Sequence, residues 1–271
     1  MSERIAFIGG GNMASAIIGG LIQRGWPSQQ IEVVEPFEAT RQALQTKFGI
    51  QAQAQAGDFL SQASQVVWAV KPQTFKEACT AVAAHTRTAL HLSVAAGIPS
   101  GSIARWLGTE RVVRSMPNTP ALIGQGITGL YARAAVTPQD RLWVEQVAAT
   151  MGEFLWLDNE DQIDVVTALS GSGPAYVFYV MEAMVDAGCA MGLSPAQSTQ
   201  LALQTFRGAS QLALTGTEPP EVLRQRVTSK GGTTHAAIST LEQHQVKTLF
   251  VQAMQAARQR ARELGEEFGK D

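Results

Sequence analysis

The hydrophobic pattern of this 271-residue chain changes once, near Asn159. Before that point, short β-branched runs alternate with amphipathic helical segments, which is typical of a parallel sheet covered by helices on both faces. After it, strand signals vanish and helical periodicity continues to the end. We therefore expect an α/β protein with two domains, a doubly wound sheet over residues 1–159 and an all-helical domain over residues 160–271.

Short connections separate the predicted elements. In the first domain we expect strands at residues 4–8, 31–35, 65–70, 89–94, 111–115, 126–132 and 153–157, and helices at 13–24, 38–47, 74–84, 100–107 and 138–150. In the second domain we expect helices at residues 161–169, 175–191, 195–214, 221–227, 236–242 and 246–264. Residues 170–174 are predicted to break the helical pattern, with Pro174 in the first turn of the next helix.

The helix predicted at residues 175–191 is apolar around most of its circumference. A surface helix of a monomer carries a single apolar stripe. We expect this helix to be both the centre of the helical domain and part of a subunit interface, which predicts a homo-oligomer.

Composition excludes several classes of protein. A hydrophobic fraction of 45% suits domains with proper cores, and a net charge of −2 argues against a nucleic-acid or membrane partner. No apolar run is long enough to cross a bilayer, and no signal-peptide pattern opens the chain, so we expect a cytoplasmic protein. Cys79 and Cys189 are isolated and the four histidines are scattered, which predicts inert thiols and no metal site.

A glycine motif follows the first predicted strand. Gly9 permits a tight turn, Gly11 lets a pyrophosphate approach the backbone, and Ala14 allows close packing of helix on strand. This strand-turn-helix context predicts a Rossmann-type dinucleotide site. The residues assigned to it are Ile8, Gly9, Gly10, Gly11, Asn12 and Met13.

Glu35, at the end of the second predicted strand, bears on the choice of cofactor. A carboxylate there accepts the ribose hydroxyls of NAD and repels the 2′-phosphate of NADP, which favours NADH. Arg41 offers an opposite possibility, because it lies within reach of a 2′-phosphate. Glu35 is otherwise only a polar strand end.

Three further loops follow strands whose carboxyl ends face the expected crevice. They comprise Ala69, Val70, Lys71 and Pro72; Ala95, Ala96 and Gly97; and Pro117 and Asn118. Lys71 is expected either to bind a ribose hydroxyl or to be a solvated surface lysine. Asn118 is expected either to fix a cofactor amide or a water, or to close an Asx turn.

A second glycine block, VTSKGGTTH at residues 227–235, precedes a predicted helix and lies far from the first in sequence. Adjacent glycines and hydroxyl residues at a helix start suit a carboxylate, because free N–H groups point out of its positive end. The alternative is ordinary N-capping by Thr233 or Thr234. His235 is expected to be an exposed residue of the first turn.

Together these motifs resemble the pyrroline-5-carboxylate reductase family, in order and across essentially the whole chain. The resemblance implies reduction of the C=N bond of 1-pyrroline-5-carboxylate to L-proline by NADPH or NADH, without a metal, in an oligomer built on a dimer of C-terminal helices. It places Thr234 at the ring nitrogen as the catalytic residue. It assigns the substrate to Ser229, Gly231, Gly232, Thr233, Thr234 and Glu160.

Two residues depart from the family pattern. Lys230 stands where many members have proline or asparagine, and Glu35 where many have small or basic residues suited to NADPH. The N-terminal glycine motif is also compatible with two other functions. A hydroxyacid dehydrogenase would need a lysine within a helix of the second domain as its acid or base, and residues 161–214 contain no lysine. A non-enzymatic dinucleotide sensor would not need the second glycine block.

Overall fold

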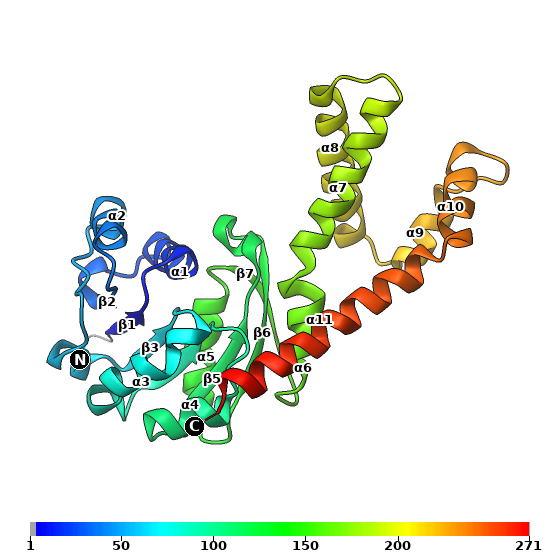
Figure 1. Ribbon diagram of the computed structural model, residues 1–271. Helices are drawn as coiled ribbons and strands as arrows, with labels where there is room; N and C mark the ends of the chain where they lie inside the picture. Colours follow the sequence, from blue (N-terminus) through cyan, green and yellow to red (C-terminus); the bar gives the residue numbers. More distant parts are fainter. Residues whose placement is uncertain (1–3, 271) are drawn as a thin grey trace. The chain divides into compact units, whose positions relative to one another are not determined.

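The computed structural model describes residues 4–270, and its first part is built on one seven-stranded sheet (Figure 1). The strand order is β2-β1-β3-β4-β5-β6-β7. The strands are β1 (Ile5–Ile8), β2 (Ile31–Val34), β3 (Gln65–Trp68), β4 (Leu90–Ser93), β5 (Val112–Met116), β6 (Gly126–Ala132) and β7 (Gly152–Trp156). All seven predicted strands are confirmed, and their ends differ from the prediction by at most two residues.

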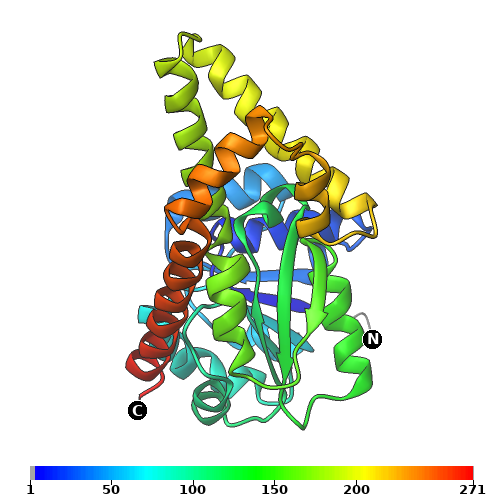
Figure 2. The ribbon, with the colours of Figure 1, turned by 90° about the vertical axis from the view of Figure 1, so that its right-hand side faces the viewer.

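The sheet is mixed, which corrects the expectation of an entirely parallel sheet. Strands β1 to β5 are parallel, but β6 pairs with β5 in the antiparallel sense, and β7 is parallel to β6. Only a short 3₁₀ segment, Thr119–Ile123, joins β5 to β6, and a parallel neighbour would need a longer crossover. Strands β6 and β7 therefore form one edge of the sheet (Figure 2).

Helices cover both faces of this sheet. One core contains apolar side chains of α1 (Asn12–Gln23), α2 (Glu38–Phe48) and α5 (Pro138–Ala148), and the other those of α3 (Pro72–Thr86) and α4 (Ser100–Leu107). Short 3₁₀ segments occupy Ser28–Gln30 and Asp58–Gln62. The doubly wound prediction is confirmed. The strand order reverses at β1, because β2 and β3 lie on its two sides, and a ligand crevice is expected at the carboxyl ends of β1 and β3.

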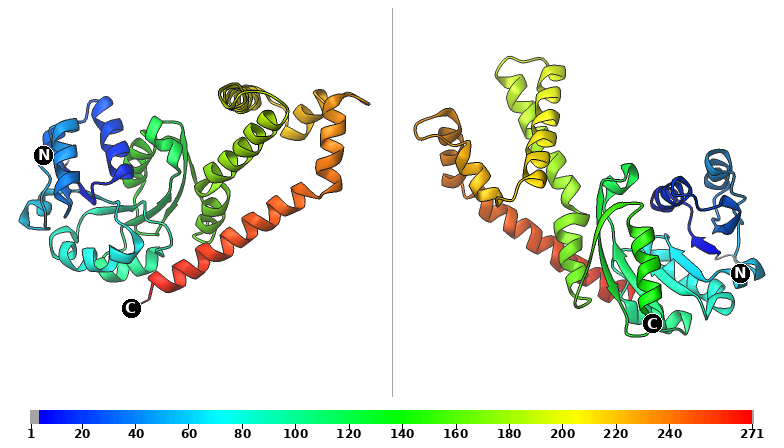
Figure 3. Two further views of the ribbon diagram at one scale, coloured as in Figure 1. Left: turned by 45° about the horizontal axis from the view of Figure 1, so that its top comes forward. Right: turned by 180° about the vertical axis from the view of Figure 1, so that it is seen from behind.

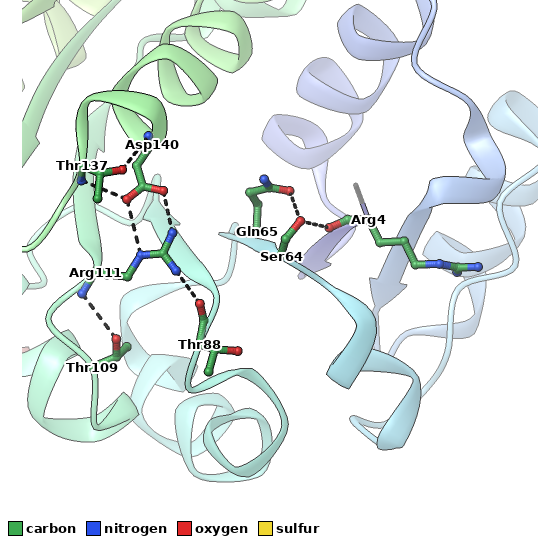
Figure 4. A network of polar contacts seen from close by, with 8 residues as sticks. All are labelled: Arg4, Ser64, Gln65, Thr88, Thr109, Arg111, Thr137 and Asp140. Carbon is green, nitrogen blue, oxygen red and sulfur yellow. Dashed lines mark hydrogen bonds and ion pairs between the residues drawn. The ribbon is translucent and has the colours of Figure 1, made fainter. Parts of the chain in front are cut away.

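The opposite, amino ends of the strands carry a polar network (Figure 4). Nη2 of Arg111 lies 2.6 Å from Oδ1 of Asp140, and Nη1 donates to the carbonyl of Thr88. Asp140 and Thr137 form a capping box at the start of α5. Burial alone would raise the pKa of Asp140, but hydrogen bonds from Arg111 and Thr137 outweigh it and lower that pKa. These contacts anchor α5 to the strand ends.

The helical interruption predicted at residues 170–174 is narrower than expected. Helix α6 (Gln162–Val166) passes into a π-helical turn, Thr167–Gly171, and α7 (Gly173–Ala190) starts after a single bend at Ser172. The Ser172 N–H donates to the carbonyl of Thr167, five residues earlier, at 2.8 Å. The glycines and serines are therefore accommodated by a wider turn rather than by a loop. Pro174 lies in the first turn of α7, as predicted.

The chain divides into two compact units, one of residues up to Ser172 together with those from Ala256 on, the other Gly173–Gln255. This grouping differs from the predicted boundary after residue 159 in the α6 region and the last helix. The remaining helices are α8 (Pro195–Thr215), α9 (Pro220–Arg226), α10 (Thr233–Gln243) and α11 (Val246–Phe268). No helix within residues 4–270 is long and apolar enough to span a membrane.

The second unit has almost no buried core in the single chain. Helices α7 and α8 pack as an antiparallel pair (Figure 3), yet Ala202 is the only apolar side chain of this unit among the buried residues described. Phe178, at 56% exposure, and Tyr179, at 72%, belong to α7. The all-round apolar character read from the sequence of this helix therefore appears as exposed apolar surface.

One buried histidine couples stability to pH. His91 on β4 is fully buried; its Nδ1 accepts from the Trp68 indole N–H at 3.0 Å, so Nε2 carries the proton and donates to the Thr86 carbonyl. Burial lowers the pKa of His91 to about 4, whereas the unfolded chain retains about 6.5. The unfolded state therefore gains a proton first as the pH falls, and stability is lost between these two values.

We expect His91 to contribute about 3 kcal/mol to this loss between pH 6.5 and pH 4. Urea unfolding at a series of pH values checks the prediction, with His91→Gln as the comparison because glutamine can accept and donate but does not titrate. The variant should show a shallower decline than wild type. Superimposable pH profiles would contradict the assignment.

Candidate functional site

Gly9 lies at the switch point between β2 and β3. Its N–H donates to the Val34 carbonyl at 2.8 Å, and the N–H of Ala69 donates to the Ile8 carbonyl at 2.8 Å. Gly9 has a φ of +94°, and a Cβ there would lie 2.5 Å from the carbonyl oxygen of Ala69. The chain can turn here only without a side chain.

The other two glycines of the motif have different surroundings. A Cβ on Gly10 would meet Leu44 at 2.8 Å, whereas a Cβ on Gly11 would have no atom within 4 Å. Gly11 is the N-cap of α1, and no side chain caps the first N–H groups of this helix. An open, positively polarised helix start fits a pyrophosphate. Asn12 is exposed, Met13 is half-buried and Ile8 is buried, all beside this turn.

Glu35 is oriented differently from the sequence expectation. The residue is 5% exposed, its Oε2 accepts from the Gly10 N–H at 2.8 Å, and its Oε1 accepts from the Phe37 N–H at 2.8 Å. The Glu35 carboxylate thus holds the glycine turn in place through its hydrogen bond to the Gly10 N–H. Arg41 Nη1 donates to the main-chain carbonyls of Glu35 and Pro36, at 2.9 and 2.7 Å.

The other predicted loops follow their strands as expected. Lys71 is the exposed N-cap residue of α3, with Ala69, Val70 and Pro72 half-buried around it. Gly97, with a φ of +72°, leaves room for Leu264, to which a Cβ would be 3.2 Å away. In the same loop Ala95 is buried and Ala96 half-buried.

Asn118, in the loop after β5, bonds to β6 rather than forming an Asx turn. Its Oδ1 accepts from the Ile127 N–H at 3.0 Å, nine residues away, whereas an Asx turn would bond two residues on. This corrects the Asx-turn alternative, and within residues 4–270 the amide N–H₂ of Asn118 has no partner and can donate to a ligand. The preceding residue, Pro117, is buried and stiffens the loop.

The second glycine block forms a β-turn before α10. The Gly232 N–H donates to the Ser229 carbonyl at 3.0 Å, and Gly231, the third residue of the turn, has a φ of +76°. That conformation suits glycine, while the second turn position, held by Lys230, is one where proline is common and most residues fit. A Cβ on Gly232 would be 2.8 Å from the Ser229 hydroxyl.

The N-capping alternative for Thr233 and Thr234 is wrong. The N-cap of α10 is Gly232, and both threonines lie in the first helical turn. Within residues 4–270 neither hydroxyl, nor the N–H groups of Thr233, Thr234 and His235, has a hydrogen-bond partner. His235 is exposed, as predicted. The first turn of α10 therefore presents unpaired donors.

Glu160 belongs to an ionic cluster that the sequence did not reveal. Its Oε1 accepts from the Ser100 N–H at 2.6 Å and from Arg114 Nη1 at 3.0 Å, and its Oε2 accepts from the Ser100 hydroxyl at 2.5 Å. Arg114 is 4% exposed and also lies 3.8 Å from Asp164, whose pKa is raised by burial despite this partner. An arginine inside the apolar strand VVRSM was the available signal. These contacts tie the start of α4 to β5 and give Glu160 a structural role.

The sheet with a glycine turn at its switch point is the architecture of enzymes that bind a dinucleotide. A family model described as NADP oxidoreductase coenzyme F420-dependent matches residues 4–97. The protein is therefore an NAD(P)-dependent oxidoreductase. A second model, described as pyrroline-5-carboxylate reductase dimerisation, matches residues 160–264, and a pyrroline-5-carboxylate reductase of Pseudomonas aeruginosa is 47% identical over 271 residues, 99% of each chain. The chain belongs to the pyrroline-5-carboxylate reductase family.

Solved structures agree with this assignment. A pyrroline-5-carboxylate reductase from Coxiella burnetii is 38% identical, has a TM-score of 0.90 and is matched over 97% of this chain and 99% of its own. A pyrroline carboxylate reductase from Plasmodium falciparum, solved with NADP bound, is 26% identical with a TM-score of 0.87, over 97% and 98%. The resemblance predicted from the sequence is confirmed. It takes the place of the two alternatives, a hydroxyacid dehydrogenase and a non-enzymatic dinucleotide sensor. The dimerisation model also indicates a homo-oligomer.

Proposed function

We propose that this protein reduces 1-pyrroline-5-carboxylate to L-proline with NAD(P)H, the last step of proline biosynthesis. The observation that carries the proposal is the 47% identity, over essentially the whole chain, to the pyrroline-5-carboxylate reductase of Pseudomonas aeruginosa. When bound, NAD(P)H supplies the hydride that adds to the carbon of the C=N bond. The protein then has to position the two reactants and manage one proton on the ring nitrogen.

The dinucleotide is assigned to the carboxyl-end loops of the sheet. The open helix start at Gly11 suits the pyrophosphate, and the free amide of Asn118 and the exposed Lys71 are donors for the rest of the cofactor. The small residues at 95–97 leave room for the dinucleotide to approach the main chain closely.

The substrate carboxylate is assigned to the turn at residues 229–232 and the start of α10. The unpaired N–H groups of Thr233 and Thr234 and the hydroxyl of Ser229 can donate to it, and the helix dipole favours its charge. Lys230 is exposed in the turn and adds a positive charge nearby. Glu160 is poorly suited to contact the substrate, because both of its carboxylate oxygens already accept hydrogen bonds from Ser100 or Arg114.

Thr234 is assigned to the imine nitrogen. A protonated imine accepts hydride more readily than a neutral one, and the Thr234 hydroxyl has no partner of its own within residues 4–270. It can therefore hold the ring nitrogen and relay its proton. His235 is exposed, and the proposed mechanism does not need it as a proton donor.

The oligomer is assigned to a dimer formed through the C-terminal helices. The exposed apolar residues of α7 and α8 support this arrangement, since such surface is normally covered. The match of the dimerisation model from residue 160 supports a domain boundary after residue 159. A cytoplasmic location stays a prediction.

An assay with both cofactors tests the proposed function. Purified protein should oxidise NADPH or NADH only when 1-pyrroline-5-carboxylate is added, with L-proline accumulating in step. The protein concentration must be one at which the oligomer is present, as checked by gel filtration. No oxidation with either cofactor under these conditions would refute the proposal.

A further inference from the structure

The carboxylate of Glu35 is already engaged by the protein itself. Both of its oxygens accept main-chain N–H groups, from Gly10 and from Phe37, and the residue is 5% exposed. A carboxylate that recognises the ribose of NAD directs its oxygens at the two hydroxyls, whereas both oxygens of Glu35 are directed at main-chain N–H groups. Glu35 thus serves to hold the glycine turn, and its side chain is poorly placed to read the ribose.

Arg41 lies at the same strand end, with its cation fixed and donors to spare. Its N–H donates to the carbonyl of Phe37, which places it one turn into α2, and Nη1 is held by the carbonyls of Glu35 and Pro36. Guanidinium groups have five N–H donors, and in residues 4–270 Nε and Nη2 of Arg41 have no partner. Two carbonyls therefore orient a charged fork beside the place where the adenosine ribose of a dinucleotide lies.

We propose that Arg41, and not Glu35, determines cofactor choice, by binding the 2′-phosphate of NADPH. A phosphate monoester carries nearly two negative charges at neutral pH, and an oriented guanidinium binds it through paired, charge-assisted hydrogen bonds. The main-chain N–H groups on Glu35 partly neutralise its charge, so it opposes the phosphate less than a free carboxylate would. The enzyme therefore prefers NADPH, contrary to the expectation from Glu35 in the sequence.

Binding of nucleotide halves tests this without any imine substrate. Calorimetry should show that wild type binds 2′,5′-ADP at least about tenfold more tightly than 5′-ADP. Arg41→Ala should remove this preference while leaving 5′-ADP affinity unchanged, and Arg41→Lys should retain part of it. Lys47→Ala, on the last turn of the same helix, removes one positive charge from α2 and should change nothing.

The variant Glu35→Gln distinguishes the role of Glu35 from that of Arg41. We expect it to lower thermal stability, because a charge that accepts two main-chain bonds is lost, while the preference for 2′,5′-ADP persists. A preference that survives Arg41→Ala, or that Glu35→Gln shifts as strongly as Arg41→Ala does, would overturn the proposal. The inference rests on dinucleotide binding alone, so discrimination between these nucleotides in a protein inactive on 1-pyrroline-5-carboxylate would refute only the proposed function.

Discussion

Replacing Thr234 by valine should lower kcat by about 10²- to 10³-fold, because the isosteric change removes only the hydroxyl assigned to the imine nitrogen. The fold should be little affected: this hydroxyl has no partner within residues 4–270 and does not cap α10. We expect the free energy of unfolding to change by no more than about 0.5 kcal/mol. Steady-state kinetics and urea unfolding of the same preparation measure both quantities.

Two matched variants sharpen this experiment. Thr234→Ser keeps a hydroxyl and should recover much of the lost turnover. Thr240→Val makes the same substitution on the same helix, where the hydroxyl bonds the Ala236 carbonyl at 3.1 Å, and should leave turnover unchanged. If Thr234→Val lost stability and activity in equal measure, its hydroxyl would be structural. If it kept full turnover, the assignment to the ring nitrogen would be wrong.

Gly9→Ala should destabilise the protein by about 3 kcal/mol or more, the second large effect we expect. The added Cβ would lie 2.5 Å from a main-chain carbonyl oxygen and 2.9 Å from its carbon, at a φ of +94°. Neither main-chain atom can rotate away as a side chain would, so β1 and β3 must separate locally. Urea unfolding measures the loss.

Gly11→Ala is the matched control for this prediction. A Cβ there has open space and an ordinary φ of −67°, so stability should change by no more than about 1 kcal/mol. The methyl group would occupy the space assigned to the pyrophosphate, and we expect affinity for 2′,5′-ADP to fall at least about tenfold. Equal stability losses in both variants would contradict the distinction between a packing glycine and a binding glycine.

Local sequence signals predicted most of the fold and the site loops. The glycine turn and the carboxyl-end loops depend on residue types at fixed spacing, which short-range geometry largely determines. Helix α10, by contrast, begins at Thr233, three residues before the predicted start at residue 236. The antiparallel direction of β6 depended on the short connection from β5. That connection contains a 3₁₀ turn, which leaves no hydrophobic periodicity in the sequence. The wider turn at residues 167–171 was equally hidden, because glycine and serine are typical of both loops and distorted helices.

Side-chain direction was the main thing that the sequence could not provide. Glu35 and Arg41 are both compatible with a cofactor contact by position, and only the structure showed one carboxylate turned onto the Gly10 N–H and one guanidinium held by carbonyls. The pairing of Glu160 with Arg114 was beyond reach for the same reason, since 46 residues separate them. Long-range polar contacts depend on the completed sheet.

The scarcity of buried side chains in residues 173–255 has a consequence for folding. A helical segment that buries so little apolar surface cannot offset the conformational entropy that it loses on folding. The missing free energy must come from association, so the stability of this part of the protein rises with protein concentration. Because α10 and the turn before it belong to this segment, we expect dilution to unfold the part to which the imine is assigned before the sheet to which the dinucleotide is assigned.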